Sequence, residues 1–200
     1  MLFMVGICLL ISGLILFTSE NNTATPQNFT AATAAPETAK PSSNEVADHQ
    51  VAADLPRIIA IPSNNVNARV MAVGTDKLNR IASPINVHDV GWFNQSSKPG
   101  QLGVMVMNGH VSSSSTPGVF YDLKNLKIGD KVYVEQGDGS RHSFLVKEKV
   151  TYDYDKVDML KVLRPINSDK PGLNLITCTG KLIKGSHEFD KRVVIFAEQY

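Results

Sequence analysis

Cysteine is scarce in this sequence, since only Cys8 and Cys178 occur among its 200 residues. Cys8 lies inside an apolar run at the N-terminus, so the rest of the chain holds a single thiol. No intramolecular disulfide can form in the globular part, and its core must be stable without such a staple. If that part lies outside the cytoplasm, Cys178 is a candidate reactive thiol.

Neither sign of charge is in excess, with 20 Lys and Arg against 19 Asp and Glu and a formal net charge of +1. Chains that bind nucleic acid or acidic surfaces typically carry a basic block or patch. We therefore expect no nucleic-acid partner. The sequence also has no internal repeat, which argues against a repeat architecture.

Residues 1–17, MLFMVGICLLISGLILF, form a nearly unbroken apolar run. This length is at the lower limit of about 17 to 25 residues for a membrane-spanning helix. A secretory signal peptide has a shorter apolar core and a small-residue cleavage site, whereas here Thr18-Ser19-Glu20 follows without an A-x-A pattern. We favour a transmembrane anchor, with a signal peptide as the alternative. No Lys or Arg precedes the run, so its charges predict no orientation.

Residues 18–55 are rich in Thr, Ala, Pro and Ser, and such a segment cannot bury enough apolar surface to offset its chain entropy. We predict a disordered tether there. An anchor followed by a tether would place residues 56–200 outside the cytoplasmic membrane. That remainder is long enough for one domain with its own core.

Short β-prone runs separated by turn residues dominate residues 56–200. We expect strands at 57–61, 68–73, 103–108, 131–135, 141–150, 173–177 and 192–197. Residues 120–126 and 155–163 are short helical candidates. Many short strands with few helices predict an all-β fold, either a closed barrel or a sandwich.

Cys178 follows a predicted strand, and a nucleophilic thiol there needs a proton partner and a group that stabilises an oxyanion. The candidate bases are His49, His88, His110, His142 and His187. His110 ends a strongly apolar strand and is followed by polar loop residues, a junction where scaffolds present catalytic groups. For the other four histidines we expect structural or solvent-exposed roles.

Arg192 begins the strand that follows Cys178 in the sequence. If the two strands pair antiparallel, the start of one lies beside the end of the other, so Arg192 and Cys178 would meet at one rim. Arginine keeps its charge in any environment and can donate several hydrogen bonds. Lys191 would point to the opposite face.

The order of these motifs resembles the sortase family. Asn108-Gly109-His110 is followed about 70 residues later by Leu175-Ile176-Thr177-Cys178, and then by Lys191-Arg192 leading into an apolar strand. The resemblance covers residues 56–200, which would be the catalytic domain. It implies an all-β fold, a closed eight-stranded barrel with short helices in its connections.

By this resemblance, Cys178 is the nucleophile, His110 the general acid/base and Arg192 the oxyanion or substrate clamp. Thr177 would orient the substrate or contribute to the oxyanion site. From the residues alone, Thr177 is an ordinary β-branched strand residue.

The resemblance also implies a reaction. The enzyme would cleave the Thr–Gly bond of an LPxTG-type sorting signal through a thioester on Cys178. It would then pass the acyl group to an amine of a peptidoglycan precursor or another surface protein. We expect a monomer with no cofactor. We also expect no metal, because the spacing of Asp153, Asp155 and Asp158 is not that of an EF-hand loop.

Gly91-Trp92-Phe93 and residues 98–103 look like class E and F sortases, although Trp92 can equally be a core aromatic. Two rival readings stay open: an extracytoplasmic cysteine hydrolase or peptidase of the same fold, and a non-enzymatic anchored barrel with an inert thiol. The motif order argues against a papain-type peptidase, whose cysteine precedes its histidine. Thr179-Gly180 after the cysteine likewise departs from the Ser-x-Gly-Cys pattern of L,D-transpeptidases.

Overall fold

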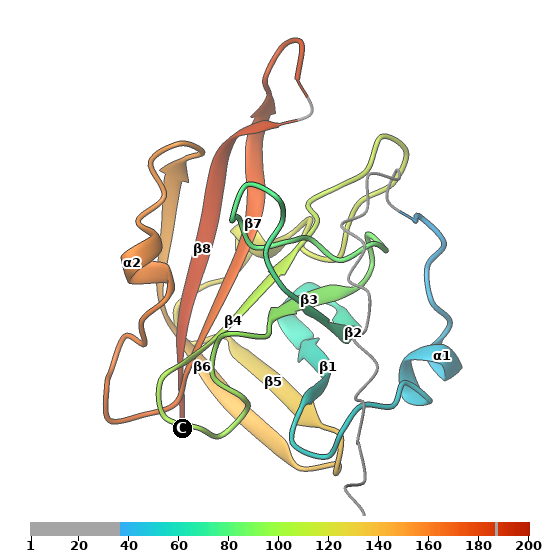
Figure 1. Ribbon diagram of the computed structural model, residues 1–200, viewed down its shortest axis with the longest axis vertical. Helices are drawn as coiled ribbons and strands as arrows, with labels where there is room; N and C mark the ends of the chain where they lie inside the picture. The colour runs from blue at the N-terminus through green and yellow to red at the C-terminus, as the bar shows by residue number, and fades with distance from the viewer. Residues whose placement is uncertain (1–36, 187) are drawn as a thin grey trace, which may run out of the picture.

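Eight strands close into a barrel in the order β1-β2-β3-β4-β7-β8-β6-β5, so the prediction of a closed eight-stranded all-β barrel is confirmed (Figure 1). The computed structural model describes residues 37–186 and 188–200. The strands are β1 (Pro56–Ile61), β2 (Val66–Val73), β3 (Val90–Phe93), β4 (Val104–Gly109), β5 (Lys131–Gln136), β6 (Arg141–Asp153), β7 (Gly172–Leu182) and β8 (Phe189–Gln199).

Two pairs of neighbouring strands in the barrel are parallel, β2 with β3 and β4 with β7, and the other pairs are antiparallel. A parallel pair cannot be joined by a tight turn and needs a longer connection. Residues 74–89 make that connection between β2 and β3. Between β4 and β7 the chain first builds β5 and β6, which pair as an antiparallel hairpin.

Strands β4, β7 and β8 bury apolar side chains on both of their faces, so each packs into two clusters. Met107, Leu175 and Ile195 belong to the cluster that fills the barrel. Val106 and Val194 belong to a second cluster on the outside of the same strands. Such strands carry near-continuous apolar runs, which is why the sequence shows little alternation there.

The segment between β6 and β7 covers this outer cluster. It contains α2 (Met159–Val162), whose Val162 is fully buried. The Asn174 Nδ2 group of β7 donates hydrogen bonds to the carbonyl oxygens of Val162 and Arg164, at 2.7 and 3.0 Å. The segment is therefore tied to the strand that carries Cys178.

Local sequence patterns overestimated the helices and missed one strand. The candidate helix at 155–163 shortens to α2, and the one at 120–126 shortens to the 3-10 turn η2 (Leu123–Asn125). A second 3-10 turn, η1 (Pro62–Asn64), follows β1. Strand β3 was not predicted because it has only four residues and all four are buried, which leaves no alternation to detect.

Residues 37–55 differ from the predicted disordered tether, because they lie along the barrel. Ser42 and Glu45 form a capping box that begins helix α1 (Ser43–Ala47), and Val46 is buried. Arg57 of β1 donates hydrogen bonds to the carbonyl oxygens of Ala47 and His49. Contacts with the barrel thus offset the ordering entropy, which composition alone does not reveal.

The predicted anchor at 1–17 and the first part of the predicted tether, 18–36, lie outside the described residues. Within the described part of the chain, no helix has the length and apolar character needed to cross a membrane.

Replacing the N-cap of α1 should loosen this segment. Ser42→Ala removes the hydroxyl that accepts from the Glu45 amide at 3.2 Å, a change expected to cost about 1 kcal/mol of local stability. Hydrogen exchange over 43–49 should therefore become about fivefold faster. Ser43→Ala, one position later, is the control. Full exchange of this segment in the wild type would contradict its ordered placement.

Candidate active site

Strand β7 has a different candidate residue on each side of Cys178. On one side β7 pairs antiparallel with β8, and Cys178 lies opposite Arg192, as the sequence predicted. On the other side β7 runs parallel to β4, with Ile176 opposite Asn108. His110 directly follows Gly109, the last residue of β4, so extending this register by two residues would set His110 opposite Cys178. The barrel thus brings all three predicted residues to one rim.

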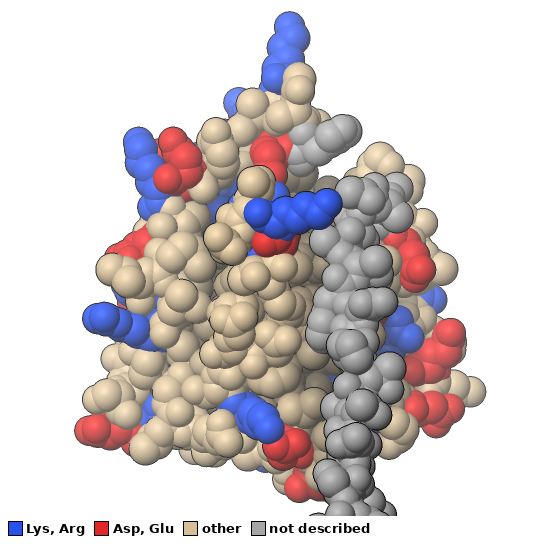
Figure 2. Space-filling model, viewed as in Figure 1, with Lys and Arg blue, Asp and Glu red and all other residues tan. Residues whose placement is uncertain are grey.

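The alternation of side chains places these three residues on the same face. Val106 of β4, Ile176 of β7 and Val194 of β8 all point into the outer cluster. Arg192 has the same parity as Val194, and Cys178 the same parity as Ile176, so both side chains project outward. His110, one residue beyond the end of β4, would continue the parity of Val106. Uncharged residues fill the centre of this side of the molecule, and charged residues lie mainly at its edges (Figure 2).

Thr177 has the opposite parity and points into the barrel, where it is buried. Its hydroxyl donates a 2.6 Å hydrogen bond to the carbonyl oxygen of Gly109. Gly109 directly precedes His110, so this bond ties the two strands together next to Cys178 and His110. The contact gives Thr177 a structural role, and its predicted part in orienting the substrate or forming the oxyanion site stays a prediction.

His110 is held on both its backbone and its ring. Its carbonyl oxygen accepts from the amide of Phe120 at 3.0 Å, and a Cβ on Gly118 would lie only 2.3 Å from that oxygen, so the close approach requires glycine. The ring Nε2 lies 2.9 Å from the carbonyl oxygen of Pro84. A carbonyl can only accept, so Nε2 carries the proton and Nδ1 of the neutral ring is free to receive one.

Arg192 is anchored by three acceptors around its guanidinium. Nη1 donates to the carbonyl oxygens of Phe189 and Lys191, at 2.8 and 3.0 Å. Nη2 forms a 2.6 Å salt bridge with Glu188 Oε2. The guanidinium also lies 6.0 Å from the centroid of the Tyr154 ring. An arginine held by so many partners keeps one orientation, which suits the recognition of a developing negative charge.

Three effects act on the pKa of the half-buried Cys178 thiol. Burial is the largest and raises the pKa above its ordinary value, because the thiolate loses hydration. The Arg192 charge lowers the pKa, and the Glu188 charge raises it. Since burial dominates, the neutral thiol is favoured at neutral pH.

The other histidines that the structure describes make hydrogen bonds away from Cys178. His49 bonds the carbonyl of Val70, His88 that of Thr38, and His142 the side chain of Gln136. His187 lies outside the described residues.

Sequence reasoning missed Pro84 and Glu188, because each acts through an atom of another residue and neither belongs to a recognisable motif. Among residues 37–186 and 188–200, no group of three His, Cys, Asp or Glu side chains could hold a metal ion.

Comparison with known proteins identifies the same family that the motifs resemble. The family model described as the sortase domain matches residues 59–200. None of the curated proteins matches the chain.

Several solved structures share the fold. Sortase C-1 from Actinomyces oris is 24% identical over 72% of each chain, with a TM-score of 0.52. Sortase C2 of pilus island 1 from Group B Streptococcus is 22% identical over 82% of each chain, with a TM-score of 0.56. Sortase A from Corynebacterium diphtheriae is 20% identical over 82% of this chain and 72% of its own, with a TM-score of 0.55.

Removing the Thr177 hydroxyl should loosen the link between β7 and β4. Thr177→Val keeps the side-chain shape but loses the buried hydrogen bond, which should lower the free energy of unfolding by about 1 kcal/mol. Chemical denaturation measures this change. Thr179→Val, two positions along the same strand, is the control. Equal stability of the Thr177 variant and the wild type would contradict the structural role.

The pH dependence of thiol alkylation should report the electrostatics of Cys178. Because burial raises its pKa, alkylation of the folded protein should reach half its maximal rate at a higher pH than alkylation of an unstructured cysteine peptide. Arg192→Ala should move this midpoint higher still, because the charge that lowers the pKa is gone. A midpoint below that of the peptide would contradict this account.

Proposed function

The chain belongs to the sortase family of cysteine transpeptidases, and we propose that it cleaves the Thr–Gly bond of an LPxTG-type sorting signal and transfers the new acyl group to an amine of the cell envelope. Membership of the family implies, in general terms, that the substrates are sorting signals and amine acceptors. We further propose the five-residue LPxTG-type motif, the Thr–Gly scissile bond and separate roles for Cys178, His110 and Arg192.

One observation carries the proposal: Cys178 of β7 lies opposite Arg192 of β8, and Thr177 just before it bonds Gly109, the last residue of β4, which leads directly into His110. Each residue supplies a different requirement of acyl transfer, namely a nucleophile, a proton carrier and a fixed positive charge. The arrangement is compatible with a peptide that lies along the outer face of β4 and β7.

In the acylation half of the reaction, Cys178 Sγ attacks the threonine carbonyl carbon and passes its proton to Nδ1 of His110. Arg192 stabilises the negative charge that develops on the carbonyl oxygen. As the C–N bond breaks, His110 returns the proton to the departing glycine amine. The products are a thioester on Cys178 and a free N-terminal glycine fragment.

In the second half, an acceptor amine attacks the thioester and loses a proton to His110. The thiolate of Cys178 leaves and regains the proton from the imidazolium, so the enzyme returns to its starting state. Two steps through a thioester replace one difficult amide exchange, which is the usual benefit of covalent catalysis. Water in place of the amine would give hydrolysis.

For the site of action, we propose that residues 1–17 anchor the enzyme in the membrane and that the catalytic domain faces the cell envelope. The apolar run at the N-terminus supports this placement. The acceptor would be an amine of a peptidoglycan precursor or of another surface protein.

The class E and F resemblance is carried by Gly91-Trp92-Phe93, where Trp92 is buried in the barrel and donates a hydrogen bond to the carbonyl of Ser97.

Intact-mass spectrometry tests the reaction directly. The purified full-length chain, incubated with an LPxTG-type peptide, should gain the mass of the peptide's N-terminal fragment, and an added amine should discharge it. Cys178→Ala should abolish the adduct. His110→Ala and Arg192→Ala should slow cleavage by about 100-fold or more, because each removes a group that acts in the transition state.

His88→Ala is the matched control for the histidine variant and should keep wild-type activity, since its ring bonds Thr38 and not the site. Peptide cleavage that survives in Cys178→Ala would refute the thioester mechanism. Several peptides with variants of the motif should be tried. If the folded wild type neither cleaves any of them nor forms an adduct with one, the non-enzymatic barrel with an inert thiol is favoured.

A further inference from the structure

The Arg192 guanidinium has five N–H groups, and its anchors occupy three of them. Two hydrogens of Nη1 go to the carbonyl oxygens of Phe189 and Lys191, and one hydrogen of Nη2 goes to Glu188. Among the residues that the structure describes, none accepts from the Nε–H or from the second Nη2–H. These two donors are the ones that remain for an oxyanion.

Glu188 supplies the only side chain among these three acceptors. It is also the one that neutralises the charge of Arg192, whose side chain is only 17% exposed. A charge this far removed from water needs a partner to stay in place. The orientation of Arg192 therefore depends on Glu188 more than on either backbone carbonyl.

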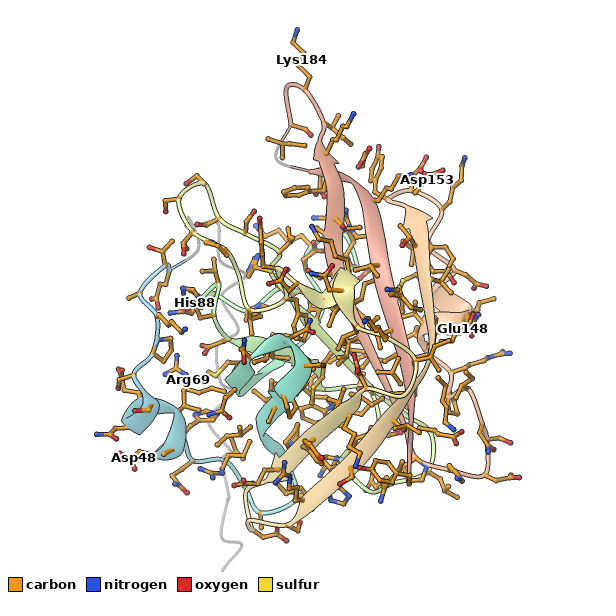
Figure 3. The ribbon with its side chains drawn as sticks, turned by 180° about the vertical axis from the view of Figure 1, so that it is seen from behind. Asp48, Arg69, His88, Glu148, Asp153 and Lys184 are labelled. Atoms are coloured by element: carbon orange, nitrogen blue, oxygen red, sulfur yellow. The ribbon has the colours of Figure 1, made fainter. Side chains whose placement is uncertain are left out.

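The backbone of Glu188 is itself held firmly. Its carbonyl oxygen accepts from the Ile183 amide at 2.8 Å, and its amide donates to Ser186 Oγ at 3.1 Å. These bonds close the β7–β8 hairpin, a ribbon that extends beyond the barrel and carries Lys184 at its tip (Figures 1 and 3). The hairpin thus places Glu188 beside Arg192.

The second carboxylate oxygen of Glu188 faces the opposite side of the site. Arg80, in the connection between β2 and β3, approaches it at 3.7 Å and is itself paired with Asp76. The same connection supplies the Pro84 carbonyl that holds His110. Glu188 therefore lies between the segment that positions His110 and the strand that carries Arg192.

We propose that Glu188 is a positioning residue for the acyl-transfer reaction: it holds the Arg192 guanidinium at the rim occupied by Cys178, with two N–H groups free for the oxyanion. This inference rests on the proposed function, in which Arg192 stabilises the developing charge. Glu188 itself touches no reacting atom.

The position of Glu188 has an electrostatic consequence for the thiol. The charged groups that act on Cys178 are Arg192 from β8 and Glu188 from the hairpin, with Arg80 beyond Glu188 and the titratable His110 just past the end of β4. Glu188 opposes the thiolate while Arg192 favours it. Removing the carboxylate charge should therefore make the thiol easier to ionise, even in a variant where Arg192 stabilises the oxyanion less well.

Two substitutions separate these effects. Glu188→Gln removes the charge but keeps an oxygen that can accept from Arg192, whereas Glu188→Ala removes both. We expect Glu188→Ala to lower kcat for peptide cleavage by about 10- to 100-fold with little change in KM, because a misplaced transition-state donor slows chemistry more than binding. Glu188→Gln should keep most of kcat. Glu188→Gln should shift the midpoint of Cys178 alkylation to lower pH, whereas Glu188→Ala should shift it less, because it also releases the Arg192 charge that lowers the thiol pKa.

Two controls show that the effect belongs to this carboxylate. Glu198→Gln makes the same change on β8 where the carboxylate pairs with Lys147 and Lys170, and should alter neither readout. In an Arg192→Ala background, Glu188→Ala should produce no further loss of kcat, since Glu188 acts through Arg192.

An unchanged kcat in Glu188→Ala, or an additive loss in the double variant, would overturn the proposal. The alkylation measurement needs no sorting-signal peptide. It therefore tests the role of Glu188 even if the wild type cleaves no peptide. In that case equal midpoints in Glu188→Gln and Glu188→Ala overturn the positioning role, whereas a lower midpoint in Glu188→Gln than in Glu188→Ala upholds it even though the proposed function fails.

Discussion

The placement of β7 between β4 and β8 is the constraint on which the site depends. Because side chains alternate along a strand, a slip of one residue in either pairing would turn Cys178 into the barrel and away from His110 and Arg192. The buried hydrogen bond from Thr177 to the Gly109 carbonyl fixes one pairing beside the site. The other is fixed by the long antiparallel ladder with β8.

Packing on both faces makes these strands a rigid platform. The interior cluster fills the barrel, and the outer cluster lies between the same strands and the segment that contains α2. Catalytic groups that must stay within fractions of an ångström are best carried by such elements, with a supporting layer of hydrogen bonds. Here Pro84 supports His110, and Glu188 supports Arg192. Both supports come from connections between strands, where changes in sequence could retune the site without altering the barrel.

The antiparallel pairing of Cys178 with Arg192 could be predicted from the sequence because the two strands follow one another in the chain and share a hairpin. The short strand β3 could not, since Val90–Phe93 is buried throughout and shows no alternation. Residues 37–55 also escaped prediction. Their composition is that of a disordered segment, and what orders them is a surface made by other parts of the chain, with Arg57 bonding the carbonyls of Ala47 and His49.

The sequence by itself determined the all-β class, the lone thiol of the described domain and the neighbours within the last hairpin, because these depend on composition and on residues close together in the chain. Only the tertiary structure decided that the end of β4, which leads into His110, lies beside the part of β7 that carries Cys178. Thr177 and Gly109, the bonded residues just before them, are 68 positions apart, and a parallel pair over that distance leaves no local pattern. Tertiary structure likewise brought Pro84 and Glu188 to the site, since a supporting contact depends on how connections fold back over the barrel and not on any motif.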